Sequence, residues 1–219
     1  MRFLMTLGTA VCAYISIILT SHPELLSSQS LTPAQVLATC DTGDLLFFTN
    51  KKAATWFKAA NPITHISVIV RDASGRPLSV ETHADVDGPP NYEGDGINAY
   101  PLEVRLAQNG ITTDLHLVKM TGPRVADNLA DALLASLPSL RAQYMYRYTY
   151  IRDEVMCRAT FGGYDVSKEM HCANFASLVL QKLGIAHLGQ RLDCVRPLDV
   201  AWLKLLEGRS YVKKSPIAN

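Results

Sequence analysis

The chain has 219 residues, of which 48% are hydrophobic and 19% are charged, and its formal net charge is +1. This composition excludes an intrinsically disordered chain, because it supplies ample apolar side chains for a core. The net charge gives no sign of a strongly basic surface, so no nucleic-acid partner is expected. The length fits one domain with a short appendage, which we place at residues 32–219 and 1–31.

Residues 3–20 form an apolar run without a charged side chain. A run of this length is at the lower limit for a membrane-spanning helix and is longer than the usual core of a signal peptide. Arg2 precedes the run, so the positive-inside rule favours a cytoplasmic N-terminus and a domain on the translocated side of the membrane. We therefore predict that residues 1–21 are a signal anchor or signal peptide that binds the membrane, followed by a linker at residues 22–31.

No clear A-x-A cleavage site follows the apolar run, which favours an uncleaved anchor over a cleaved signal peptide. Cleavage is the alternative, and it would release the domain as a secreted protein. A buried helix of the domain itself is a less favoured interpretation, because such a helix normally carries a polar face.

The domain is predicted to open with a short helix and a strand. Thr32 is a residue type that caps helices, a proline follows it at the first helical position, and Gln35 completes a capping-box pattern. The predicted helix spans residues 33–38. The apolar residues 45–48 should form a strand, and residues 53–60 can form a helical turn or two.

A β-hairpin is predicted next. Residues 65–70 are rich in β-branched side chains, residues 72–75 have turn chemistry, and residues 78–82 are typical of a returning strand. The stretch 85–98 is rich in Gly, Pro, Asp and Asn, so we expect a long surface loop there.

The middle of the chain is predicted to add two strands and a helix. Residues 102–106 alternate between apolar and charged side chains, as a half-buried strand does, and residues 114–120 form the other strand. An amphipathic helix should span residues 121–137, where Pro138 interrupts it. Residues 144–150 carry tyrosines at alternate positions, which is typical of an extended segment.

The best-defined predicted element is a helix at residues 172–183, whose apolar positions form one inward stripe and which Gly184 should end. A last helix is predicted at residues 197–206. Strands in the middle of the chain, with helices before and after them, indicate an α+β domain with a central, mainly antiparallel sheet.

Cys172 is predicted at the first turn of this helix. The unpaired N–H groups and positive dipole of a helix N-terminus favour a thiolate and can stabilise an oxyanion, so Cys172 is a candidate nucleophile. Its place on the inward stripe also suits a small core residue, which is the simpler interpretation of a cysteine without a partner. The five cysteines show no CxxC spacing and no zinc-site interval, so we predict neither a metal site nor a cofactor.

His65 and Glu81 are the candidate partners of Cys172. A thiol nucleophile needs a base to take its proton, and the base needs a third group to orient it. His65 opens the first strand of the hairpin and Glu81 ends the second. A hairpin loop with an odd number of residues places both side chains on one face, diagonally adjacent, whereas an even loop places them on opposite faces.

The other histidines of the domain are weaker candidates. His83 is a reserve base, because it lies two residues after Glu81. His171 precedes Cys172 directly, and since adjacent residues on a helix do not face each other, we expect it to act through its charge only. His116 and His187 are predicted to be structural or surface residues.

The order of these motifs resembles a known family. The motifs are Gly43-Asp44-Leu45-Leu46-Phe47-Phe48, Thr64-His65-Ile66-Ser67-Val68-Ile69, Val80-Glu81-Thr82 and His171-Cys172-Ala173-Asn174-Phe175-Ala176-Ser177-Leu178-Val179. In this order they resemble the circularly permuted branch of the NlpC-like, papain-like hydrolase superfamily, which includes bacterial lipoproteins, poxvirus proteins and relatives of lecithin retinol acyltransferase. In that branch the His strand and the acidic strand precede the Cys helix.

The resemblance implies a permuted papain-like fold, with a sheet packed on the nucleophile helix. It also implies that Cys172 is the nucleophile, His65 the base and Glu81 the group that orients His65. The sequence departs from the family at Ala173-Asn174, where permuted members often carry Ser-Glu.

Two functions are consistent with this sequence. The first is a thiol hydrolase or acyltransferase that acts on an amide or ester bond of a lipid or peptide through a thioester. The alternative is a non-catalytic, membrane-anchored structural component of a complex or virion that retains the fold. The sequence does not identify a protein partner.

Overall fold

The computed structural model describes residues 29–50, 63–83, 96–108, 113–120, 124–146, 169–185, 200 and 206–212. The predicted anchor at residues 3–20, the helical turn at residues 53–60 and His187 lie outside these described residues. Within the described part of the chain, no helix is long and apolar enough to cross a bilayer.

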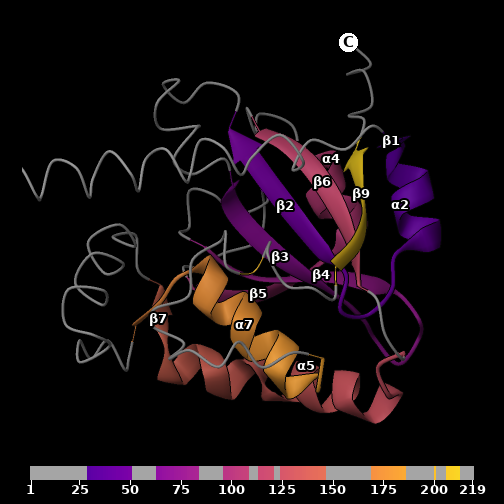
Figure 1. Ribbon diagram of the computed structural model, residues 1–219. Helices are drawn as coiled ribbons and strands as arrows, with labels where there is room; N and C mark the ends of the chain where they lie inside the picture. Colours follow the sequence, from indigo (N-terminus) through magenta and orange to yellow (C-terminus); the bar gives the residue numbers. More distant parts are fainter. Residues whose placement is uncertain are drawn as a thin grey trace, which may run out of the picture.

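The fold is built on a seven-stranded sheet with the order β1-β9-β6-β2-β3-β4-β5 (Figure 1). Neighbouring strands are antiparallel, except that β1 and β9 run parallel. The strands are β1 (Gln29–Leu31), β2 (Leu45–Asn50), β3 (Ile63–Arg71), β4 (Pro77–His83), β5 (Gly96–Pro101), β6 (Thr113–Met120) and β9 (Leu206–Val212). A small parallel pair is formed by β7 (Met145–Tyr146) and β8 (Glu169–Met170).

The described helices are α2 (Pro33–Thr39), α4 (Leu102–Ala107), α5 (Asp127–Gln143) and α7 (Cys172–Lys182). With the sheet they make an α+β structure, so the predicted class and the predicted mainly antiparallel sheet are confirmed. The capping box of α2 is also confirmed: the Gln35 N–H donates to the Thr32 hydroxyl, and the Thr32 N–H donates to the Gln35 side-chain oxygen.

Helices cover both faces of the sheet. On one face α5 and α7 share a hydrophobic core with strand residues that include Ile66, Val68 and Val80. On the other face α2 and α4 pack on a second core that includes Leu46 and Ile69. Adjacent residues such as Val68 and Ile69 therefore enter different cores, as the alternation of side chains along a strand requires.

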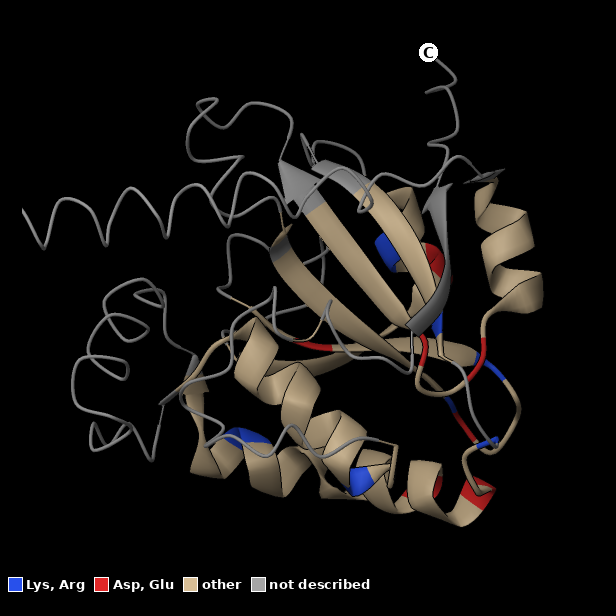
Figure 2. Ribbon diagram, in the orientation of Figure 1, with Lys and Arg blue, Asp and Glu red and all other residues tan. Residues whose placement is uncertain are grey.

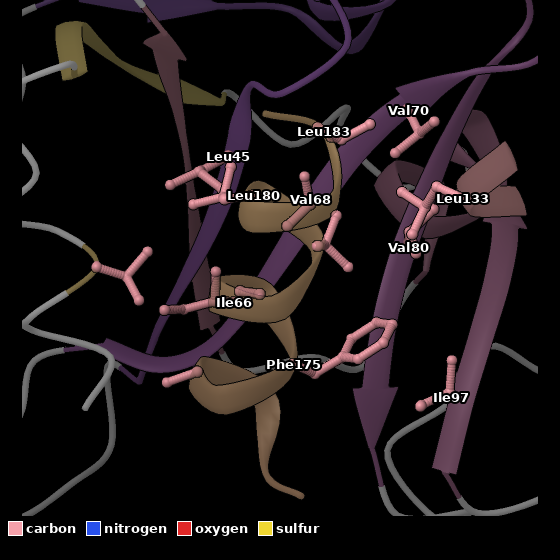
Figure 3. Packing of buried hydrophobic residues seen from close by; sticks show 14 of the residues in the cluster. Leu45, Ile66, Val68, Val70, Val80, Ile97, Leu133, Phe175, Leu180 and Leu183 are labelled. Atoms are coloured by element: carbon pink, nitrogen blue, oxygen red, sulfur yellow. The ribbon is translucent and has the colours of Figure 1, made fainter. Parts of the chain in front are cut away.

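Helix α7 runs in the same direction as β3. Figure 3 shows this in the labelled side chains, which progress from Ile66 to Val70 along the strand as they progress from Phe175 to Leu183 along the helix. The N-terminus of α7 therefore lies at the end of the sheet where β3 begins and β4 ends. The predicted helix at residues 172–183 is confirmed, and Gly184 follows it with φ at +69°.

The prediction of a strand at residues 102–106 is wrong, because these residues form helix α4. Leu102 and Leu106 lie four residues apart and are both buried in the core beneath α2. An apolar pair at this spacing fits one face of a helix as well as one face of a strand. The burial of Arg105 between them decides the outcome, since a regular strand would turn it away from both leucines.

The expected loop at residues 85–98 is wrong at its C-terminal end. Residues 96–98 belong to β5, which pairs with β4 in the register Glu81↔Asn98. Ile97 is buried in the core shared with α5 and α7, so the strand is held by packing as well as by its pairing. The glycine and asparagine in this segment favoured a loop in the prediction, but tertiary contacts stabilise a strand.

The predictions for the helices at residues 121–137 and 197–206 need correction at their ends. Helix α5 begins at Asp127 and continues through Pro138 to Gln143, so the proline does not interrupt it. Leu137 and Leu140 are buried on either side of Pro138, and this packing offsets the hydrogen bond that proline cannot make. Val200 is helical as predicted, but Leu206 begins strand β9 and does not end a helix.

The packing predicts how two substitutions affect stability. Leu180 is fully buried beneath the sheet, so Leu180→Ala should lower the free energy of unfolding by about 2–5 kcal/mol. Met145 is 65% exposed, so Met145→Ala should change it by no more than about 0.5 kcal/mol. Urea unfolding of both variants measures this, and equal effects would contradict the described core.

Candidate active site

The β3–β4 hairpin has the register that brings His65 and Glu81 together. Val68 pairs with Val80 and Arg71 pairs with Pro77, so the connecting loop is residues 72–76, an odd number. Positions 65 and 81 then lie diagonally adjacent on one face, as the odd-loop alternative predicts.

Hydrogen bonds and backbone conformation within the loop stabilise it at this length. The Asp72 carboxylate accepts hydrogen bonds from the N–H groups of Ser74 and Arg76, at 2.9 and 3.0 Å. Gly75 has a φ of +80°, a conformation that suits glycine. An Asp, Ser and Gly in this order therefore set the register on which the candidate site depends.

The carboxylate of Glu81 contacts the imidazole of His65 directly. The distance between His65 Nε2 and Glu81 Oε2 is 2.5 Å, and the two side chains are 15% and 0% exposed. Ser67 and Ser79 repeat the same diagonal one step along the hairpin, with their hydroxyl oxygens 2.5 Å apart. Ser79 also donates to Glu81 Oε1 at 3.1 Å, so both carboxylate oxygens of Glu81 have partners.

Arg105 of helix α4 is a member of the site that the sequence analysis missed. Its guanidinium donates from Nη2 to Glu81 Oε2 at 2.9 Å, and its side chain is 2% exposed. Few residues on the described strands are coloured as charged in Figure 2, and Glu81 and Arg105 are both buried. The misassigned strand at residues 102–106 hid this contact, although a charged residue between two leucines was visible in the sequence.

Cys172 is the first residue of α7, and an interaction with the imidazole of His65 lowers the pKa of its thiol. The helix covers one face of the sheet, whereas His65 packs edge-on against Phe48 on the other, with ring centroids 5.0 Å apart. The thiol therefore meets the imidazole at the end of the sheet, beside the start of β3, and not through it. Since Glu81 occupies Nε2 of His65, Nδ1 is the ring nitrogen left for the thiol.

His171 has a larger part in the site than the sequence analysis predicted. It is the N-cap of α7, with extended backbone, and its Nδ1 accepts a hydrogen bond from the N–H of Ala173 at 3.2 Å. Asn174 accepts one from the N–H of His171 in return, which completes a capping box. The interaction of His171 with Cys172 lowers the pKa of the thiol. The rule that adjacent helical residues do not face each other does not apply to His171, because it lies just outside the helix.

The electrostatics of the three groups favour an ion pair. Burial alone would raise the pKa of the Cys172 thiol, but interactions with His171 and His65 lower it to about 6. Burial alone would lower the pKa of His65, but its bonds to Cys172 and Glu81 raise it to about 9. Between these values the thiolate and the imidazolium are the predominant forms.

Glu81 is the fixed negative charge behind this pair. Burial would raise its pKa, but Arg105, the bond and charge of His65, and the charge of His83 lower it to about 2. The carboxylate therefore stays ionised wherever the thiolate and imidazolium coexist.

His83 and His116 are the remaining histidine candidates within the described structure. His83 is buried and bonded to the hydroxyl of Tyr100, and it reaches the site through its effect on Glu81. His116 is a buried residue of β6, as a structural interpretation expects. The described residues contain no group of three or more His, Cys, Asp or Glu side chains arranged to hold a metal ion.

Comparison with known proteins gives no match to this chain, either among protein-family models or among curated proteins.

The low pKa of Cys172 predicts an early rise in its alkylation rate. The iodoacetamide rate at Cys172 should rise through a midpoint near pH 6, against an ordinary thiol value of 9.0. Mass spectrometry of the digested protein follows each cysteine separately. Cys40 is the internal control, because burial raises the pKa of its thiol and it should react slowly at neutral pH. A Cys172 midpoint near 9 would contradict the ion pair.

The low pKa of Glu81 predicts how its contribution to stability depends on pH. The folded-state value is about 2 and the ordinary value is 4.5, so the contribution is complete above about 4.5 and is lost as the pH falls through about 2. Glu81→Gln should lower the free energy of unfolding by about 3–5 kcal/mol at pH 7, because it leaves buried cations unpaired. Urea unfolding at several pH values should show that the free energies of unfolding of Glu81→Gln and the wild type approach each other as the pH falls. A difference that does not change with pH would refute the low pKa of Glu81.

Proposed function

We propose that this protein is a cysteine-dependent hydrolase or acyltransferase that acts on an amide or ester bond. The observation that carries the proposal is the direct contact of Glu81 with His65, whose imidazole also interacts with the Cys172 thiol and lowers its pKa. Nucleophile, base and orienting carboxylate are thereby linked in the order that thiol catalysis needs. Each of the three comes from a different element, namely α7, β3 and β4.

In the first half of the reaction, the thiolate of Cys172 attacks the carbonyl carbon, and the carbonyl π electrons move onto the oxygen. The resulting oxyanion lies close to the N-terminus of α7, where helix N–H groups favour negative charge. Collapse of this intermediate breaks the bond to the leaving amine or alkoxide, which takes a proton from the His65 imidazolium. The product is a thioester on Cys172.

In the second half, neutral His65 takes a proton from water or from an acceptor amine or hydroxyl. The activated nucleophile attacks the thioester carbonyl, and the Cys172 thiolate leaves. His65 is again protonated, so the ion pair is restored. Water as acceptor makes the protein a hydrolase, and any other acceptor makes it an acyltransferase.

We assign the domain to a permuted papain-like fold on the order of its parts. The strands that carry His65 and Glu81 precede the helix that carries Cys172, and that helix packs on a mainly antiparallel sheet. This is the arrangement that the resemblance to the permuted NlpC-like branch implies. We further propose that residues 3–20 hold the domain at a membrane, on the translocated side, which would place lipids or membrane-proximal peptides within reach as substrates.

One observation favours the second candidate, a non-catalytic membrane-anchored structural component of a complex or virion. Cys172 is 7% exposed, so a substrate carbonyl must gain access to a nearly covered thiol. A structural component could retain such a thiol as a small core side chain.

Turnover of a substrate panel separates the two candidates. Short acyl esters and lipid or peptide amides should be turned over by the wild type, and intact-mass measurement should detect an acyl adduct on Cys172. Cys172→Ala should abolish the adduct, and His65→Ala should reduce the rate by about 10²–10⁴-fold, because the general base is lost.

Cys40→Ala is the matched control, since Cys40 lies in the other core of the sheet and should leave turnover unchanged. Absence of an adduct and of turnover across the panel, in wild-type protein that is folded, would favour the structural role.

A further inference from the structure

Arg105 lies in an environment that an arginine seldom occupies. Its side chain is 2% exposed, and the neighbouring Leu102 and Leu106 belong to the apolar core beneath α2. A buried cation is costly unless an opposite charge and hydrogen bonds compensate it. The compensation here comes from Glu81, the carboxylate of the candidate site.

The guanidinium is held in place on several sides. Nη2 donates to Glu81 Oε2, the same oxygen that contacts His65, and Nη1 donates to the side chain of Gln108. The carbon of the guanidinium lies 4.6 Å from the ring centroid of Phe48, and Phe48 in turn meets His65 edge-on. Arg105 therefore touches two of the groups around His65, the Glu81 carboxylate and the Phe48 ring.

We propose that Arg105 is a positioning residue, which keeps the Glu81 carboxylate charged and aimed at His65 and acts on the Cys172 thiol only through these two side chains. This inference rests on the proposed function of the site. It adds a fourth member, from helix α4, to the group formed by Cys172, His65 and Glu81.

The charges of the four side chains alternate along the chain of contacts. Arg105 is positive, Glu81 negative, the His65 imidazolium positive and the Cys172 thiolate negative, so the buried group is neutral as a whole. Among the described residues, His83 near Glu81 and His171 beside Cys172 are further titratable side chains that act on these groups. Without Arg105 the group carries a net negative charge in a buried place, and protonation of the thiol or of the carboxylate is the least costly way to remove it.

The experiment measures the pH profile of Cys172 alkylation by iodoacetamide in Arg105→Met and Arg105→Lys. Arg105→Met should raise the midpoint from the wild-type value near 6 by about one pH unit or more, as loss of a nearby opposite charge does. Arg105→Lys keeps the charge, so its alkylation midpoint should lie close to that of the wild type. A merely structural arginine would alter the unfolding midpoint of these variants without moving the profile of the folded protein.

Arg76→Met is the matched control. Arg76 pairs at 2.5 Å with Glu103, which lies on α4 as Arg105 does. This pair is about half exposed and does not include Glu81. The Cys172 profile of Arg76→Met should equal that of the wild type. A shift as large as that of Arg105→Met would show that α4 acts through its general anchoring and would overturn the proposal.

A double-variant comparison tests whether Arg105 acts through Glu81. In a Glu81→Gln background, adding Arg105→Met should leave the alkylation midpoint where Glu81→Gln alone places it. An equal shift in both backgrounds would overturn the proposed route. If Arg105→Met alone does not fold, the double variant, which removes both buried charges, and Arg105→Lys carry the same comparison.

The outcomes separate this proposal from the proposed function. A wild-type alkylation midpoint near 9 would contradict the ion pair and with it the proposed catalytic function. A wild-type midpoint near 6 that Arg105→Met leaves unchanged removes the role of Arg105 and leaves the function standing.

Discussion

The contact between Glu81 and His65 is the interaction on which the candidate site depends. It joins two strands within a sheet covered on both faces, and it places a fully buried carboxylate against an imidazole. A buried charge of this kind is stable only while every oxygen has a partner. The remaining partners come from Ser79 and Arg105, so the hairpin and helix α4 must both be in place before the imidazole is oriented.

The orientation of His65 in turn decides the state of the thiol. With Nε2 committed to Glu81, the other ring nitrogen is left for the interaction with Cys172 at the start of α7. The N-cap His171 adds a second imidazole beside the sulfur and also closes the first turn of the helix. Stabilisation of the helix end and stabilisation of the thiolate are thus carried by the same residue, which links the local fold to the proposed chemistry.

Much of this site could be predicted from short-range patterns. The capping box at Thr32, the turn residues after Arg71 and the apolar stripe from Cys172 each depend on neighbours a few positions apart, and each is found as predicted. Whether His65 and Glu81 share one face of the hairpin depends on whether its loop has an odd or an even number of residues. Asp72 and Gly75 determine that number through local hydrogen bonds and backbone conformation. Helix α4 was missed because its Leu-Glu-Val-Arg-Leu pattern alternates as a strand does, although the spacing of its two leucines also fits one face of a helix.

The sequence by itself determined the α+β class, the hairpin that carries His65 and Glu81, and a thiol at a helix N-terminus, because caps, turns and periodicity act between near neighbours. The tertiary structure alone decided that Arg105 lies against Glu81 and that Cys172 interacts with His65. These contacts join residues far apart in the chain, and their energies arise from burial and charge, which exist only once both cores have formed around them.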